Sequence, residues 1–188
     1  MRKIIAAINL TIDGFCDHTG MLPDEELHFH YQNLLNDADA ILYGRKTFEL
    51  MQFWQTLVNN PSGEKSMDDF AIAIDNVPKI VFSHTLKNSD PKGLGWDSAK
   101  LATQPLDVVV KELKQQPGKD IFIGSRSLIV QLTNLNLIDE YQLCIHPVIV
   151  GKGLPLFDEI NERTIFKLLK TKNLNSGATI HYYQRVYF

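Results

Sequence analysis

The sequence predicts an α/β domain with a mostly parallel central sheet and antiparallel strands at one edge. Apolar, strand-like segments alternate with amphipathic, helix-like segments over most of the chain, as they do in parallel sheets. Two strand-like segments, 4–10 and 40–43, are almost continuously apolar, which is typical of strands covered on both faces. The last third is rich in strand patterns and has a hairpin-like turn at Asn175-Ser176-Gly177, so the antiparallel strands should come at the end.

Composition places the chain among ordinary globular proteins. With 188 residues, 44% of them hydrophobic and 22% charged, it is long enough for one domain, 1–188, with a sizeable core. A net charge of −3 argues against a nucleic-acid binder, and no apolar run has the length of a membrane span. The first apolar run ends at Asn9 without a cleavage site, so we expect a first strand and a cytoplasmic protein. Cys16 and Cys144 have neither disulfide-framework nor zinc-ligand spacing, and we expect no metal.

Local signals assign the individual elements. Asp24 can cap a helix whose apolar face includes Leu27, Tyr31 and Leu35. A second helix is expected from about Thr47, ending before the turn-rich residues 59–63, and an exposed loop over 87–96. Further helices are expected at 68–74, 106–113 and 128–135, and further strands at 79–82, 99–102, 121–123, 141–150 (interrupted by Pro147), 165–169 and 178–187.

One stretch combines a buried strand with an abrupt, basic turn. The apolar run 40–43 stops at Gly44 and is followed by Arg45, Lys46 and Thr47, where a helix can begin. Free backbone N–H groups at a helix start, together with positive charge, suit a phosphate. The alternative is that Gly44 makes a tight turn and the two cations are solvated, because a lone turn of this kind is a weak motif.

Two further turns should meet the first at one sheet edge. Ser83-His84 follows a predicted strand, and Gly124-Ser125-Arg126-Ser127 joins another to a helix. Ligands of open parallel sheets bind beyond the carboxyl ends of the strands, so these turns can hold a pyrophosphate, with Arg45, Lys46 or Arg126 meeting a further phosphate. The alternative is that Gly and Ser serve turn geometry alone. Neither a Rossmann glycine fingerprint nor a P-loop is present.

Together, the motifs resemble the dihydrofolate-reductase-like family, and within it the C-terminal reductase domain of bacterial riboflavin-biosynthesis proteins and its stand-alone relatives. Residues 7–15 resemble the family's first strand and its S-L-D-G-like turn, and 41–49 its G-R-x-T-[FYW]-E segment. Residues 79–83 are similar to its central strand ending in Ser. The most specific block runs from Leu-Ile-Asp-Glu at 137–140 to the P-V-x-x-G-x-G-x-x-L-F pattern at 147–157.

The resemblance implies a three-layer sandwich that binds NADPH across the strand ends and transfers a hydride to a pteridine-, pyrimidine- or carbonyl-type substrate. One departure is that dihydrofolate reductases proper have Gly-Gly where this chain has Gly124-Ser125. Asn9 and the Asp13-Gly14 turn would border the nicotinamide and the substrate. The resemblance assigns the cofactor's phosphates and adenosine to Gly44, Arg45, Lys46, Thr47, Ser83, Gly124, Ser125 and Arg126.

The substrate side is less sharply defined by the sequence. Dihydrofolate reductases proper place a carboxylate on the first helix, and here Asp24, Glu25, Glu26 and His28 lie near that place. We therefore take Asp13, Glu26 and His28 as the candidate catalytic residues. The competing explanation is that acidic residues in a first turn simply favour the helix dipole. Three side chains at near-helical spacing are candidates for the substrate pocket, with part of the set expected in the core: Phe48, Met51 and Trp54.

Other function classes remain open at this point. The fold can host a non-catalytic nucleotide- or ligand-binding protein, or a structural dimer whose strand-rich end mediates association. The resemblance adds an expectation of a homodimer. For the reductase, the expected partner is a small-molecule substrate, with neither nucleic acid nor membrane.

Overall fold

The computed structural model describes residues 1–86 and 94–186, and within them a single sheet runs through the molecule. Its strands are β1 (Ile4–Thr11), β2 (Ala38–Gly44), β3 (Lys79–Phe82), β4 (Ala99–Leu101), β5 (Asp120–Ile123), β6 (Glu140–His146), β7 (Phe166–Asn173) and β8 (Thr179–Arg185). The spatial order is β4-β3-β2-β5-β1-β6-β8-β7. Neighbours from β4 to β6 pair in parallel, whereas β8 pairs antiparallel with β6 and β7 with β8. The predicted fold class, including the antiparallel strands at one edge, is confirmed.

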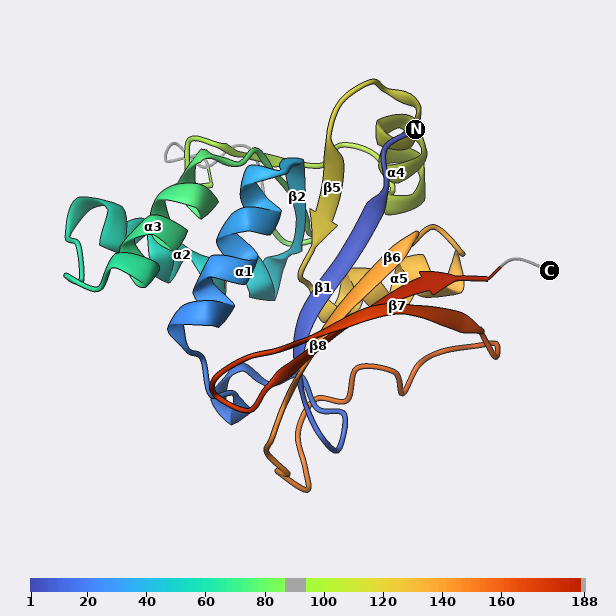
Figure 1. Ribbon diagram of the computed structural model, residues 1–188. Helices are drawn as coiled ribbons and strands as arrows, with labels where there is room; N and C mark the ends of the chain where they lie inside the picture. The colour runs from blue at the N-terminus through green and yellow to red at the C-terminus, as the bar shows by residue number, and fades with distance from the viewer. Residues whose placement is uncertain (87–93, 187–188) are drawn as a thin grey trace.

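Helices cover both faces of the sheet (Figure 1). The first group consists of α1 (Glu25–Asn36), α2 (Arg45–Asn59) and α3 (Lys65–Asn76), and the second of α4 (Leu106–Gln115) and α5 (Arg126–Asn134). A short 3-10 turn, η1 (His18–Gly20), precedes α1. None of the helices among the described residues has the length and apolar character needed to cross a membrane.

The core is divided by the sheet into two layers. Ile4, Ala6 and Ile8 of β1 pack with the apolar side chains of α4 and α5, while Ala7 packs with those of α2 and α3. A strand buried on both faces needs apolar residues at consecutive positions, which explains the unbroken apolar run at the start of the chain.

Several element boundaries differ from the predicted ones. The strand expected over 141–150 ends at His146, because its last pairing with β1 is Thr11 with His146 and Pro147 has no N–H to continue a ladder. Helix α2 begins at Arg45, two residues earlier than predicted, and α3 is longer at both ends than the predicted 68–74. The strand predicted over 165–169 extends to Asn173. Residues 87–93 of the predicted loop, and residue 187, lie outside the described residues.

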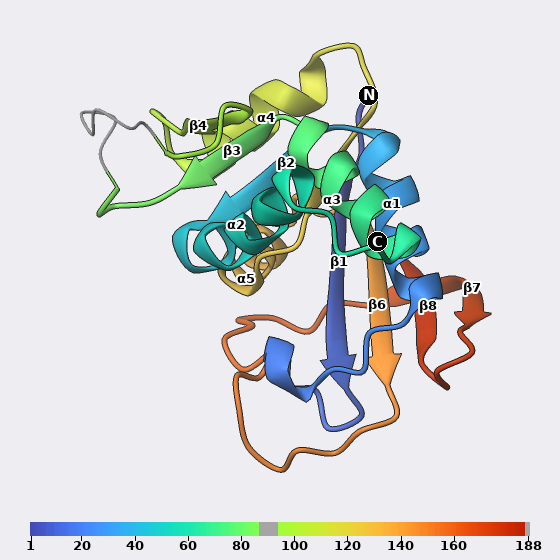
Figure 2. The same cartoon turned by 90° about the vertical axis from the view of Figure 1, so that its left-hand side faces the viewer.

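Residues 147–165, which we call the cover segment, connect β6 to β7 without helix or strand. The segment passes around the carboxyl ends of β1 and β6, beside the chain that follows β1 (Figure 2). An antiparallel bridge joins Phe15 to Pro155, and the Cys16 N–H donates to the Leu154 carbonyl at 2.9 Å. The carboxyl edge of the sheet is therefore bordered by two irregular segments that contact each other.

Candidate functional site

The strand-to-helix junctions β2–α2 and β5–α5 meet at the carboxyl edge of the sheet. Gly44 is the N-cap of α2 and Ser125 the N-cap of α5, and the Gly44 N–H donates to Ser125 Oγ at 3.0 Å. Both residues are buried, and a Cβ at Gly44 would lie 2.9 Å from Ser127 Oγ. The absence of a side chain at Gly44 therefore lets the first turn of α5 approach the start of α2.

Neither of these two helices has a side-chain cap at its N-terminus. Helix α1 differs, since Asp24 Oδ1 accepts a hydrogen bond from the Leu27 N–H at 2.8 Å. The hydroxyl that could cap α5 is instead bound to Gly44. Uncapped N-termini leave backbone donors and a partial positive charge, and a pair of them side by side suits an anion with more than one phosphate.

The predicted basic residues near these junctions have different environments. Arg45 lies on the surface and forms an i,i+4 ion pair with Glu49 at 2.9 Å, while Lys46 is exposed and Thr47 is half-buried. Exposed pairs of this type contribute little and exchange partners readily. Arg45 and Lys46 are therefore available to a ligand at the start of α2.

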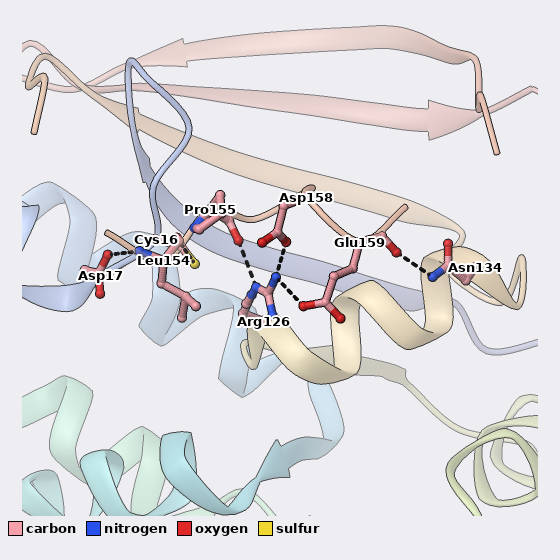
Figure 3. Close-up of polar contacts among 8 residues, drawn as sticks. All are labelled: Cys16, Asp17, Arg126, Asn134, Leu154, Pro155, Asp158 and Glu159. Carbon is pink, nitrogen blue, oxygen red and sulfur yellow. Dashed lines mark hydrogen bonds and ion pairs between the residues drawn. The ribbon is translucent and has the colours of Figure 1, made fainter. Parts of the chain in front are cut away.

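Arg126 is held inside the protein by the cover segment (Figure 3). Its Nε donates to the Pro155 carbonyl at 2.8 Å, and its Nη2 contacts Asp158 and, at 3.0 Å, Glu159. The guanidinium side chain is only 16% exposed. The structure thus ties Arg126 to two carboxylates, so its contacts fasten the cover segment to α5.

The far end of α5 fastens the same segment. Asn134 Nδ2 donates to the Glu159 carbonyl at 3.0 Å, and its Oδ1 accepts from the Asn161 N–H at 3.0 Å. Figure 3 shows Asn134 and Arg126 at opposite ends of α5, both directed toward the cover segment. The helix that begins at the β5–α5 junction therefore also positions the cover segment.

Ser83, Gly124 and Asn9 are the other predicted cofactor contacts. Ser83 Oγ accepts hydrogen bonds from the N–H groups of Thr85 (3.1 Å) and Leu86 (3.0 Å), so it shapes the turn after β3. A Cβ at Gly124 would lie 3.2 Å from the Phe122 ring and 3.7 Å from the Ala7 carbonyl. Asn9 Oδ1 accepts from the Tyr31 hydroxyl at 3.0 Å. Asn9 lies in the carboxyl half of β1, and Gly124 directly follows the carboxyl end of β5. The resemblance assigns Asn9 to the nicotinamide and Gly124 to the pyrophosphate.

Asp13 joins the turn after β1 to the cover segment. Its carboxylate accepts hydrogen bonds from Thr11 Oγ1 at 2.6 Å and from the Gly151 N–H at 2.7 Å, with the Val150 N–H at 3.2 Å. These hydrogen bonds, chiefly the one from Thr11, lower the pKa of Asp13. These contacts favour the ionised carboxylate of Asp13, which holds the turn after β1 against the cover segment.

Glu26 contacts the β7–β8 turn. Its Oε2 accepts from the Asn175 N–H at 2.6 Å, and Asp24 Oδ2 accepts from the neighbouring Ser176 N–H at 3.1 Å. Both carboxylates thus attach the start of α1 to the C-terminal hairpin. Of the three candidate catalytic residues, Asp13 and Glu26 therefore bind backbone N–H groups of loops. His28 has a different environment, in a cavity.

His28 lines a cavity of about 550 Å³ formed where the first turns of α1 and α3 meet α2. Its ring lies edge-on to Trp54, with centroids 5.6 Å apart, and stacks on Phe70 at 6.0 Å. His28 Nδ1 lies 3.4 Å from Ser66 Oγ. Burial is the main cause that lowers the pKa of His28, so the imidazole is neutral at pH 7. The cavity therefore offers a flat aromatic surface and an uncharged imidazole.

The predicted pocket side chains divide between this cavity and the core. Trp54 lines the cavity, whereas Phe48 is buried against Trp96 at 6.1 Å and Met51 packs on the same core cluster. Neither Phe48 nor Met51 lines this cavity. Sequence reasoning missed the wall contributed by α3, which includes Ser66 and Met67, because nothing local distinguishes its first turn from any other exposed helix start.

Two more histidines lie beside the site without entering the cavity. His146 is fully buried, and its Nδ1 accepts from the Leu22 N–H at 3.3 Å. His30 lies against the Tyr182 ring, and burial together with Lys172 and Lys170 lowers its pKa to about 4. Within the described parts of the chain, no three His, Cys, Asp or Glu side chains gather in a way that could hold a metal ion.

Comparison with solved structures shows the same fold. A protein from Shewanella sp. PV-4 assigned to riboflavin biosynthesis superposes with a TM-score of 0.73 at 21% identity, covering 98% of this chain and 99% of the other. A pyrimidine reductase-like protein from Corynebacterium diphtheriae gives 0.68 at 18% identity, covering 100% and 93%. A diaminohydroxyphosphoribosylaminopyrimidine deaminase/5-amino-6-(5-phosphoribosylamino)uracil reductase from Thermotoga maritima gives 0.68 at 16% identity, and this chain matches 57% of its length.

Sequence comparison gives closer relatives. The uncharacterized protein YyaP of Bacillus subtilis (strain 168) is 34% identical over 183 residues, covering 94% of this chain and 92% of that protein. The family model described as the RibD C-terminal domain matches residues 2–180. The chain belongs to the RibD C-terminal domain family.

Proposed function

We propose that this protein is an NADPH-dependent reductase of a small pteridine-, pyrimidine- or carbonyl-type compound. The observation that supports this most directly is the pair of uncapped helix N-termini at Gly44 and Ser125, held together by one buried hydrogen bond at the carboxyl edge of the sheet. Membership of a family of reductase-type domains points to the same reaction class.

The residues present fit the phosphates of a dinucleotide. The first turns of α2 and α5 supply backbone donors, and the lack of a side chain at Gly44 lets these two turns lie close together. Arg45 and Lys46 would meet the extra phosphate of NADPH at the start of α2. Arg126 would act indirectly, by fixing the cover segment, because Asp158 and Glu159 already hold its guanidinium. The bound cofactor supplies the hydride, and the protein has to orient it and exclude water.

We place the substrate in the cavity between α1, α2 and α3. Trp54 provides a ring surface, and the neutral imidazole of His28 is the candidate group for proton exchange with the substrate. Asp13 and Glu26 would then be positioning residues, since each accepts a hydrogen bond from a backbone N–H group of a loop.

Calorimetric titration with NADPH and NADH tests the cofactor assignment. We expect NADPH to bind more tightly than NADH, and absence of binding by both at millimolar concentration would sink the proposal. If NADPH binds, its oxidation is then followed with pterins, aminopyrimidines and quinonoid compounds. Binding without turnover of any of these would favour the alternative of a non-catalytic ligand-binding protein.

We also propose a homodimer that uses the β7 edge of the sheet. Strand β7 is the last strand in the sheet order, and nearly all of its residues are exposed, including Leu168 and Leu169. An exposed edge of this length can pair with a second copy. Sedimentation velocity should give the dimer mass for the native chain and the monomer mass for Leu168→Pro, and a native monomer would refute the proposal.

A further inference from the structure

The cavity beside His28 has an aromatic side that can stack on a flat ligand. Trp54 lies edge-on to Phe70 with centroids 4.5 Å apart and edge-on to His28 at 5.6 Å, so two ring contacts hold the indole in place. Phe53 lies 5.5 Å from Trp54 at the rim of the cavity and is 54% exposed. The exposed ring of Phe53 lies beside the indole of Trp54. A planar ligand that enters the cavity would bury part of this exposed aromatic surface.

The residues that line the same cavity carry more negative than positive charge. Asp24, Glu25 and Glu64 line it as carboxylates. Against these three carboxylates the described lining residues include one cation, Lys65, whose exposed side chain forms an i,i+4 ion pair with Asp69. The N-termini of α1 and α3 each bring a partial positive charge of about half a unit, which is less than the unit charge of Asp24 or of Glu64 beside them.

We infer that this cavity selects a flat, neutral or positively charged aromatic compound and rejects phosphorylated or carboxylated ones. A cation over the faces of Trp54 and Phe53 is attracted by the rings and by the three rim carboxylates. An anion gains neither interaction and meets three carboxylates against one lysine among the described lining residues. The substrate named for the T. maritima relative carries a phosphoribosyl group. The inference assigns this chain an unphosphorylated substrate instead.

Three probes of nearly identical shape test the inference: benzamidine (cationic), benzamide (neutral) and benzoate (anionic). Calorimetric titration at low ionic strength should rank them in that order, with benzamidine about tenfold tighter than benzoate, as expected for several exposed charges acting together. In the double variant Glu25→Gln/Glu64→Gln the ratio should fall to about threefold or less. The matched control Glu112→Gln/Glu162→Gln removes the same charge from exposed positions outside the cavity and should leave the ratio unchanged.

Each contrary result is decisive. Equal or tighter binding of benzoate, or no binding of any probe at millimolar concentration, overturns the inference. A preference for benzamidine that stays near tenfold in Glu25→Gln/Glu64→Gln overturns its assignment to this cavity. The inference rests on the proposed function in treating the cavity as the substrate site, but its test contains no cofactor. A failed NADPH titration with an intact charge preference would therefore refute the reductase and leave the binding preference standing.

Discussion

Replacing Ser125 with alanine removes the acceptor that joins the β2–α2 and β5–α5 junctions. Ser125 is 1% exposed, and its Oγ accepts from the Gly44 N–H at 3.0 Å, so the variant leaves a buried backbone donor without this partner. An unsatisfied buried donor costs about 1–3 kcal/mol. For a chain of this size, each kcal/mol lowers Tm by about 2–4 °C, which gives a loss of about 2–12 °C.

Urea unfolding followed by circular dichroism measures this cost directly. We expect a lower midpoint at an unchanged m-value, because the surface exposed on unfolding stays the same. Ser127→Ala is the matched control, since Ser127 is an exposed residue in the same helix turn and the change should alter the free energy of unfolding by less than about 0.5 kcal/mol. The reasoning is refuted if Ser125→Ala is as stable as the native chain, or if both variants lose the same amount.

Three other predictions concern charge. Arg45→Ala/Lys46→Ala should weaken NADPH more than NADH in calorimetry, because only NADPH has the extra phosphate; equal losses contradict this role. The folded pKa of His30, about 4, lies below its ordinary 6.5, so the unfolded chain binds more protons between these values. The contribution of His30 to the free energy of unfolding is fully present above about pH 6.5 and should fall by about 2–3 kcal/mol toward pH 4. His30→Leu should flatten this dependence of the unfolding free energy on pH, and an unaltered pH dependence in that variant refutes the assignment. Arg126→Ala should speed hydrogen exchange at the Leu154 and Leu156 amides while β1 stays protected, and unchanged exchange would show that Arg126 does not fasten the cover segment.

The order of strands and helices could be predicted because buried positions require apolar residues, and their spacing in the sequence differs between strands and helices. The unbroken apolar run of β1 and the alternation of elements indicate a covered parallel sheet, and Asp24 was recognisable as a cap. The end of β6 was harder to predict, since residues 148–150 are as apolar as a strand requires. Strand β6 ends where β1 has no further residue to pair with it. The residues of β1 that decide this lie more than a hundred positions away in the sequence.

The candidate site was predictable at the level of turns and not of individual contacts. Gly44 and Ser125 were expected at one edge, and they meet there. The partners of Arg126 could not be predicted, because a surface arginine and one held by Asp158 look alike in a sequence. The cavity wall from α3 was also missed, since periodicity reports which face of a helix is buried and says nothing about which helix lies opposite.

The cover segment has a consequence for how such a protein can diversify. Its shape is held by side chains of the loop after β1 and of α5, through Asp13, Arg126 and Asn134. None of these three contacts is part of the sheet's hydrogen-bond ladder. Substitutions and length changes between Pro147 and Ile165 can therefore alter the chain that borders the carboxyl edge of the sheet while the hydrogen-bond ladder of the sheet stays intact. Such variation is expected in this loop and in the few side chains that hold it.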